Sequence, residues 1–361
     1  MQTTIHLVPE QFSAKEAPLV DAGELSASAF RFPSGVCALR LKNSLGELVM
    51  LPFQGQQIWD AVMRGRRITM KSMFDQPYPT TDFLSNHGGF LLHCGATVMG
   101  APGPGDTHPL HGELHNAPYQ SAALVLGTDE KGDYIGLTGT YRHILAFNYN
   151  YTATPLLKLY AGSSVFSVSM TIHNLKGSPM PLMYLEHVNF CPVDGGRLVQ
   201  SVVCDTQNMK VRAYIPPFMD VSPGYRQLVQ ELQVHPEKHL VFDPGLDYDP
   251  EMVLFLTYRA DQAGWAHTLQ VHPDGSADVA RHRPSQMDHG VRWICRTPDQ
   301  DALGIEPCTA EVEGLQAETK KGNVRSLPGG ASFTCDLEIG VLQPDEARRE
   351  EQLVQQVLGQ A

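Results

Sequence analysis

Apolar and polar residues alternate with a period of two in many short stretches of this chain, which is typical of β-strands that bury one face. In residues 164–173, for example, Phe166, Val168, Met170 and Ile172 would face one way and the polar residues between them the other. Further strands are expected over residues 36–42, 47–51, 182–190, 253–258, 268–271 and 333–341. The first two of these flank an Asn-Ser-Leu-Gly turn and predict a β-hairpin.

Helical periodicity is convincing only near the C-terminus. Pro344 and Asp345 are typical of a helix start, acidic residues fill the first turns, and a stripe of leucine and valine follows. We expect a helix at about residues 345–358. The chain carries no internal repeat and no linker-like stretch. The pattern therefore predicts one all-β domain over residues 1–361, an antiparallel sandwich or barrel with a short C-terminal helix.

The composition favours a folded protein that does not bind nucleic acid. Of the 361 residues, 42% are hydrophobic and 18% are charged, which is typical of a chain with a large core. The net charge is −12, and no basic cluster is denser than residues 64–67, whereas phosphate-backbone binding needs clustered Lys and Arg. The N-terminus lacks the features of a signal peptide, and the uncharged stretch 83–105 is too rich in His, Asn, Gly and Pro for a membrane span. We therefore expect a cytoplasmic protein.

Residues 72–119 form a long stretch rich in glycine and proline, which predicts an irregular segment with a functional role. Its last part concentrates polar groups at His108, His111, Glu113 and His115. If the chain is extended there, the last three lie on one side and form a polar pocket wall. These histidines could instead bind a metal ion or satisfy neighbouring backbone groups. The pattern alone leaves these alternatives open.

Two later segments also carry polar groups in apolar surroundings. On the strand expected over residues 182–190, His187 and Asn189 share one face and Glu186 lies on the other. His187 is either a core residue or, if its face lines a cavity, a group suited to proton transfer near neutral pH. Glu306 lies in a short apolar strand, where a buried carboxylate needs either a cationic partner or a role as general base.

Three short motifs occur in a fixed order along the chain. They are Pro-Leu-His-Gly at residues 109–112, Glu-His-Val-Asn-Phe at 186–190 and Leu-Gly-Ile-Glu-Pro at 303–307. Together they resemble the galactose mutarotase (aldose 1-epimerase) superfamily, and most closely a poorly characterised, epimerase-like branch of it. The resemblance spans most of the chain. It implies a large antiparallel β-supersandwich whose concave face holds a sugar, and an isomerase that needs neither cofactor nor metal.

The resemblance also implies roles for individual residues. Glu306 would be the base that takes the proton from the anomeric hydroxyl, His187 the acid that protonates the ring oxygen, and His111 a hydrogen-bonding partner of the sugar. Family members carry a substrate-contacting arginine before the loop histidine. This chain has no arginine between Arg67 and Arg142, so either Arg66 or Arg67 would have to reach the sugar or the contact is lost. The family's sugar-binding aspartate has no assignable counterpart.

The remaining polar residues of the motifs, His108, Glu113 and Asn189, are candidates for further sugar contacts. Two other functions could use the same site. An aldose–ketose isomerase could act through an enediol, with His93 and His108 holding a divalent metal, and a non-catalytic protein could bind the sugar as a sensor.

The remaining features concern metals and partners. The seven cysteines are scattered without a Cys-x-x-Cys pair, so neither a structural zinc site nor a disulfide framework is expected. The expected partner is a small-molecule sugar. An exposed strand edge or the C-terminal helix could also mediate a homodimer.

Overall fold

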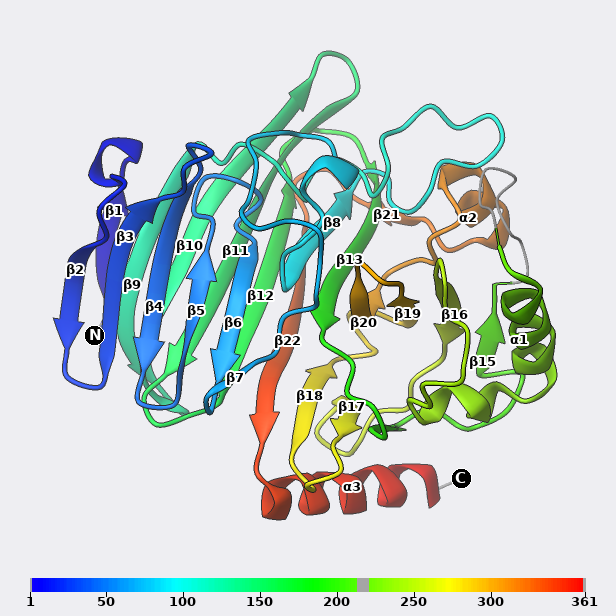
Figure 1. The fold of residues 1–361 in the computed structure, drawn as a ribbon. Coiled ribbons are helices and arrows are strands. Elements are labelled where there is room, and N and C mark those ends of the chain that lie inside the picture. The colour runs from blue at the N-terminus through cyan, green and yellow to red at the C-terminus, as the bar shows by residue number, and fades with distance from the viewer. Residues whose placement is uncertain (1, 213–220, 360–361) are drawn as a thin grey trace.

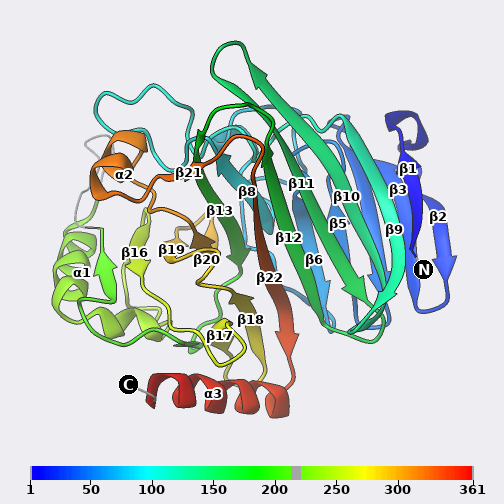
Figure 2. The ribbon, with the colours of Figure 1, turned by 180° about the vertical axis from the view of Figure 1, so that it is seen from behind.

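Two antiparallel β-sheets packed face to face form the bulk of the structure, a computed structural model that describes residues 2–212 and 221–359 (Figures 1 and 2). The first sheet contains, in spatial order, β1 (Thr3–Leu7), β9 (Ser121–Asp129), β10 (Gly132–Leu145), β11 (Tyr149–Tyr160), β12 (Val165–Asn174), β22 (Ser332–Leu342), β18 (Ala277–His282), β17 (Ala266–Val271) and β14 (Arg197–Gln200). The predicted antiparallel β-sandwich is confirmed.

The second sheet is wider, and its centre carries the two later sequence motifs. It contains, in spatial order, β15 (Met209–Val211), β16 (Met252–Leu256), β19 (His289–Arg296), β20 (Asp301–Cys308), β13 (Met180–Phe190), β8 (Leu91–Ala96), β6 (Ile58–Met63), β5 (Gly46–Met50), β4 (Cys37–Asn43), β3 (Leu25–Arg31) and β2 (Ala17–Ala22). Two short strands pair beside this path, β7 (Arg66–Arg67) with β6 and β21 (Arg325–Leu327) with β13.

The main core lies where the inward faces of the two sheets meet. Phe166 of β12 and Leu39 of β4 belong to the same buried cluster. Strand β12 shows the alternation that its sequence predicts, because its even-numbered residues are buried and its odd-numbered residues are partly exposed. The predicted hairpin is also present as β4 and β5. Its turn is held by Asn43, whose side-chain oxygen accepts hydrogen bonds from the amides of Leu45 and Gly46, each at 2.9 Å.

Strand β8 and two helices do not follow from the sequence pattern. Strand β8 lies inside residues 72–119, which we expected to be irregular, and all six of its residues are buried, so they show no alternation. Helix α1 (Pro223–Val234) packs beside β15, and its N-cap Ser222 accepts a hydrogen bond from the Tyr225 amide at 2.9 Å. The remaining short elements are α2 (Leu315–Lys321) and the 3-10 turns η1 (Pro9–Gln11), η2 (Leu84–Asn86) and η3 (Pro236–Leu240). Within the described residues, no helix is both long and apolar enough to cross a bilayer.

The predicted C-terminal helix is confirmed as α3 (Pro344–Gly359), which lies along one end of the sandwich against β17, β14 and β22 (Figure 1). Its Val354 is fully buried. Its Glu350 contacts His267 Nδ1 at 2.7 Å and accepts a hydrogen bond from Arg281 Nη2 at 2.9 Å. Burial alone would raise the pKa of Glu350, but these hydrogen bonds lower it to about 2. The helix is therefore attached to the sheet by apolar packing and by one buried carboxylate.

Replacing Glu350 with glutamine should lower the free energy of unfolding by up to about 3 kcal/mol at pH 7. Because the folded-state pKa lies below the unfolded value, this stability is present above about pH 4.5 and is lost as the pH falls towards 2. Chemical denaturation of both proteins between pH 3 and 7 should show a difference that shrinks as the pH falls.

The matched control for this substitution is Glu351→Gln in the same helix. Glu351 pairs with Arg197, whose side chain is 48% exposed, so its loss should cost less than about 1 kcal/mol. Equal effects of the two substitutions would contradict the role given to Glu350.

Candidate functional site

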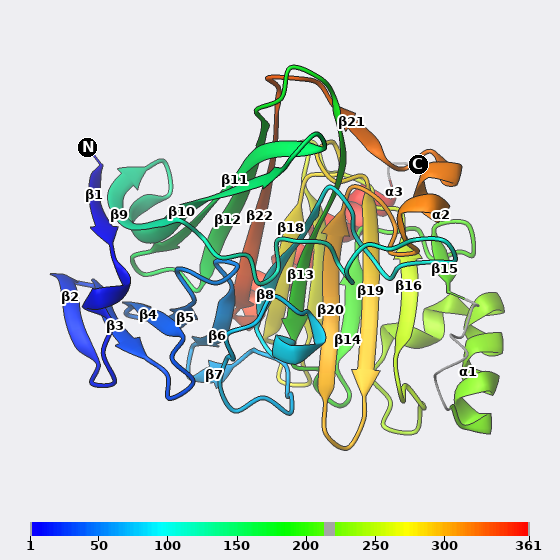
Figure 3. The same ribbon diagram turned by 90° about the horizontal axis from the view of Figure 1, so that it is seen from above.

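A cavity of about 510 Å³ opens on the face of the second sheet that points away from the main core. Strands β13, β20, β19 and β16, which lie side by side in Figure 3, contribute lining residues. Segments 73–87 and 101–111 supply further lining. Most of the lining side chains are apolar. The polar ones are His87, His111, His187, Arg212, Glu251, Gln300 and Glu306.

His187 is held in one orientation by Asn189, its neighbour on the same face of β13. The Asn189 amide nitrogen donates to the Gly89 carbonyl at 3.0 Å, so the Asn189 Oδ1 faces His187 Nδ1 at 2.7 Å. This network assigns the proton of the neutral ring to Nδ1 and leaves Nε2 free to accept one. Burial, together with nearby His87 and His111, lowers the pKa of His187 well below its usual range. The ring is therefore neutral when the cavity is empty.

Glu306 lies on the adjacent strand β20 and is buried next to His187. Its Oε1 is 3.5 Å from His187 Nδ1 and has no hydrogen-bond partner within the described residues. Burial raises the pKa of Glu306 well above its usual range, with Arg292 opposing this effect and Glu251 adding to it. Both members of the pair are thus shifted towards their uncharged forms, which is common where groups transfer protons.

Two loop histidines, His87 and His111, complete this side of the cavity. Their ring centroids lie 5.1 Å and 5.5 Å from that of His187, and Phe83 packs against both. Burial lowers the pKa of His87 to about 4 and that of His111 to about 3. The sequence motifs identified His111, but His87 was missed because it lies between Ser-Asn and Gly-Gly, with no other histidine or carboxylate at a recognisable spacing.

The extended run expected for His111, Glu113 and His115 is wrong. His111 and Gly112 have φ values of 56° and 78°, so the chain turns in the left-handed region at this point. His115 contacts the edge of Phe83, with ring centroids 5.1 Å apart. Glu113 instead accepts hydrogen bonds from Tyr151 at 2.8 Å and from Thr97 at 2.9 Å, away from the residues that line the cavity.

The cavity takes its arginine from a part of the chain that lies outside the sequence motifs. Arg212 is the only Lys or Arg among the described residues that line it. Its guanidinium forms an ion pair with Glu251, whose other oxygen accepts a hydrogen bond from Trp293 Nε1 at 2.8 Å. Arg67, which we expected to reach the sugar, instead pairs with Asp60 at 2.7 Å and lies in a neighbouring surface hollow.

His93 and His108, the two residues considered as metal ligands, lie in separate environments. His93 is buried on the opposite face of the sheet, 3.0 Å from Glu186 and 2.7 Å from the Tyr184 hydroxyl. Glu186 therefore occupies the face that the strand alternation predicts. His108 Nε2 lies 3.7 Å from Asp106 and accepts a hydrogen bond from the Leu315 amide at 3.3 Å. Neither residue lines the cavity.

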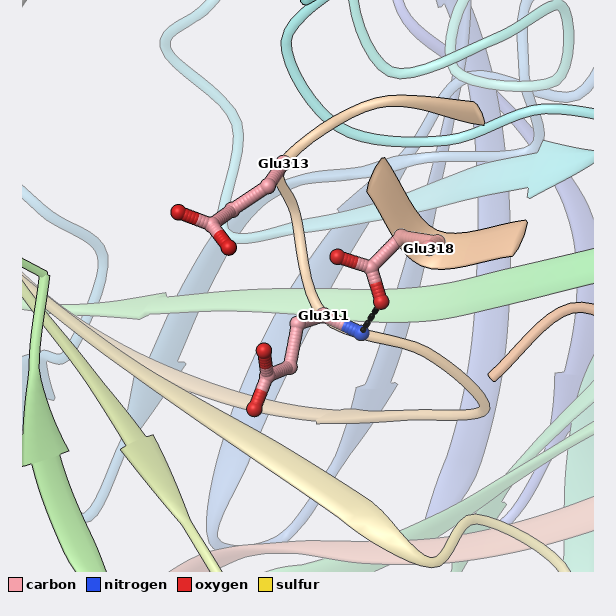
Figure 4. Close-up of side chains that lie close together, drawn as sticks. All are labelled: Glu311, Glu313 and Glu318. Carbon is pink, nitrogen blue, oxygen red and sulfur yellow. Dashed lines mark hydrogen bonds between the residues drawn. The ribbon is translucent and has the colours of Figure 1, made fainter. Parts of the chain in front are cut away.

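Three carboxylates elsewhere, Glu311, Glu313 and Glu318, lie close enough together to share a cation (Figure 4). The ammonium group of Lys321 already contacts all three, with the Glu318 contact at 2.9 Å. Glu318 also accepts a hydrogen bond from the Glu311 amide at 3.0 Å. A lysine of the chain itself therefore balances much of the negative charge of this group.

Comparison with known proteins establishes the fold. A Klebsiella pneumoniae protein provisionally named an aldose 1-epimerase superposes with a TM-score of 0.83 at 17% identity, over 99% of this chain and 96% of that one. A galactose mutarotase-like protein from Clostridium acetobutylicum superposes with a TM-score of 0.58 at 14% identity, over 88% and 98% of the two chains. At these identities the likeness establishes a galactose mutarotase-like β-sandwich, as the motifs implied.

Sequence comparison adds less. A family model described as a domain of unknown function, DUF4432, matches residues 33–211. No curated protein matches the sequence.

The burial of Glu306 should appear as a pH-dependent loss of stability. Because the folded-state pKa of Glu306 is raised, this residue does not destabilise the fold below about pH 4.5. Above that value, the free energy of unfolding falls by at most about 1.4 kcal/mol per pH unit. Glu306→Gln should therefore be more stable than the unmodified protein near neutral pH, and the difference should shrink towards pH 4.5. Denaturation curves at several pH values measure it.

Glu350→Gln is the control of opposite sign, because the pKa of Glu350 is lowered. A difference for Glu306→Gln that is constant with pH would show that the carboxyl group titrates normally.

Proposed function

We propose that the protein is a carbohydrate epimerase of the aldose 1-epimerase type. The observation that carries the proposal is the Glu306–His187 pair, with its atoms 3.5 Å apart and both groups buried in one wall of a ligand-sized cavity. Interconversion of anomers through ring opening requires one group that accepts a proton from the anomeric hydroxyl and one that donates a proton to the ring oxygen, and both oxygens are bonded to the same carbon. These two residues can supply both groups without a cofactor.

The reaction assigned to this pair is ring opening followed by ring closure. Glu306 takes the proton from the anomeric hydroxyl while His187 gives a proton to the ring oxygen, and the bond between the anomeric carbon and the ring oxygen breaks. The resulting aldehyde turns about its bond to the next carbon. The same steps in reverse then close the other anomer, and both residues regain their starting states.

The distribution of protons between Glu306 and His187 determines whether the pair can act in the proposed roles. A neutral Glu306 beside a neutral His187 holds the same number of protons as a carboxylate beside an imidazolium. Burial favours the neutral form. The proposed roles require the charged form, so the site must contain an influence that stabilises the Glu306 carboxylate.

The other cavity residues suit a sugar ring. His111 and His87 can hydrogen-bond hydroxyl groups, since their Nδ1 atoms are buried without a partner within the described residues. Arg212 and Glu251 offer donors and acceptors on the side of β16, and Trp293 presents an aromatic surface to the C–H groups of a sugar. We expect a small-molecule sugar as ligand and a cytoplasmic location.

The positions of His93 and His108 do not favour the metal-assisted isomerase, because both residues lie outside the cavity. A sugar-binding protein without catalysis would use the same cavity. Exchange NMR distinguishes all three functions.

Exchange NMR on a panel of aldoses at neutral pH measures the interconversion of anomers directly. The unmodified protein should accelerate exchange without incorporating solvent deuterium at carbon. Glu306→Gln and His187→Gln should each lower the rate by roughly 10²- to 10⁴-fold, the usual effect of removing a general acid or base.

His108→Gln serves as the control, because His108 lies outside the cavity, and it should retain a rate near that of the unmodified protein. Deuterium at carbon 1 or 2 would indicate an enediol and an isomerase instead. Binding of a sugar without exchange would indicate a sensor.

A further inference from the structure

Arg292 is a fully buried cation on the face of the second sheet opposite to the cavity. Its neighbours on β19, Val291 and Trp293, line the cavity, so Arg292 points into the space between the two sheets. Its Nη2 donates to Gln200 Oε1 at 2.7 Å, and its Nη1 donates to the Gly304 carbonyl at 3.2 Å. Within the described residues it has no carboxylate within ion-pair distance, and its Nε has no acceptor. Burial of a charge without an ion-pair partner costs free energy of folding.

Gly304 brings Glu306 close to this cation from the other side of the sheet. Gly304 and Glu306 are two residues apart on β20 and share the cavity face. A Cβ atom at Gly304 would overlap Glu306 Oε1, so the carboxyl group lies against the glycine backbone. The carbonyl of the same glycine accepts the hydrogen bond from Arg292. The backbone of Gly304 therefore lies between the Arg292 guanidinium and the Glu306 carboxyl group.

Little water can screen this interaction. Arg292 is 0% exposed and Glu306 is 2% exposed. Opposite charges attract much more strongly in such a medium than in water. Burial raises the pKa of Glu306, and Arg292 is the strongest influence in the opposite direction.

The other groups around the pair carry little free charge. Around Glu306 they are His187, His87, His111, Cys94, Cys308, Glu251 and Arg212, and around Arg292 they are His239, Tyr258 and Gln200. Burial keeps both thiols protonated by raising their pKa values, and it keeps His239 neutral by lowering its pKa to about 4. Glu251 is balanced by Arg212. Arg292 is therefore the uncompensated cation that faces Glu306.

We propose that Arg292 is a positioning residue that favours the ionised form of Glu306, against the effect of burial, through the backbone of Gly304. It thereby shifts the shared proton of the Glu306–His187 pair towards His187. The catalytic role of Arg292 rests on the proposed function, whereas its effect on the Glu306 carboxyl group does not.

Titration of the Glu306 carboxyl group tests the inference without any substrate. The protein is labelled with ¹³C at glutamate side chains, and the Glu306 signal is identified by its loss in Glu306→Gln. In Arg292→Gln the titration midpoint should move upward by about one pH unit, because an opposite charge has been removed. In Arg292→Lys, which keeps the charge but changes the hydrogen bonds, the midpoint should stay near its original value.

The pH profile of anomer exchange provides the second readout. The acidic limb of kcat/KM should move upward in Arg292→Gln by the same amount as the carboxyl midpoint, a change that a purely structural role would not produce. An unmoved carboxyl midpoint in folded Arg292→Gln would overturn the inference, as would an equal shift in Arg292→Lys. A shifted midpoint in a protein without any exchange activity would support the inference and reject the proposed function.

Arg292→Met replaces Arg292→Gln if the latter does not fold. Exchange of a buried charge for an apolar side chain of similar length is often tolerated. The same upward movement of the Glu306 midpoint is expected in Arg292→Met, and an unmoved midpoint there would also overturn the inference.

Discussion

The removal of water from Glu306 is the constraint on which the site depends. A carboxyl group that is 2% exposed, with one oxygen lacking a hydrogen-bond partner in the described structure, favours its protonated form. His187 beside it is shifted towards its neutral form by the same burial. The pKa values of the two groups are thus moved from their values in water, that of Glu306 upward and that of His187 downward. Environments of this kind set the acid and base strengths of titratable side chains.

The backbone of the second sheet holds the buried side chains of the site in place. Strand β13 supplies His187, β20 supplies Glu306 and β19 supplies Trp293, and these three strands are consecutive neighbours in the second sheet. Because each backbone is fixed by hydrogen bonds on both sides, the side chains keep their spacing although they are far apart in the sequence. Loop residues cover them, and Phe83 packs on the histidine rings. The strands therefore fix the spacing of these side chains, and the loops shield them from water.

The parts of the fold that could be predicted are those in which one face of an element is exposed. Strand β12 and helix α3 show a clear period because water contacts one side of each. Strand β8 is buried on both faces, so its residues other than His93 are apolar or small, and they show no alternation of apolar and polar positions. The location of Glu306 and His187 in one cavity agrees with the motifs, which marked both residues although their strands are almost entirely buried.

The sequence did not predict the cavity residues whose positions depend on tertiary contacts. His87 follows η2 in an irregular segment, and Arg212 follows the short strand β15. Neither residue has a local sequence pattern that marks it. Arg67 was expected to reach the sugar because it is the nearest preceding arginine, but its strand β7 pairs at the side of β6, where Asp60 holds it. Position along the chain is a poor guide to position around a cavity formed by distant strands.

The presence of Arg212 in the cavity, in place of the expected Arg67, affects the electrostatics of the site as well as its layout. Arg212 is already paired with Glu251, and Glu251 is held in turn by Trp293 Nε1. A paired guanidinium can still donate hydrogen bonds through its remaining N–H groups, but it offers little net charge to a ligand. An anionic group would have to compete with Glu251, whereas a hydroxyl would not. The electrostatics of this wall therefore suit an uncharged ligand better than an anionic one, and the uncompensated charge of the region lies behind the sheet, at Arg292.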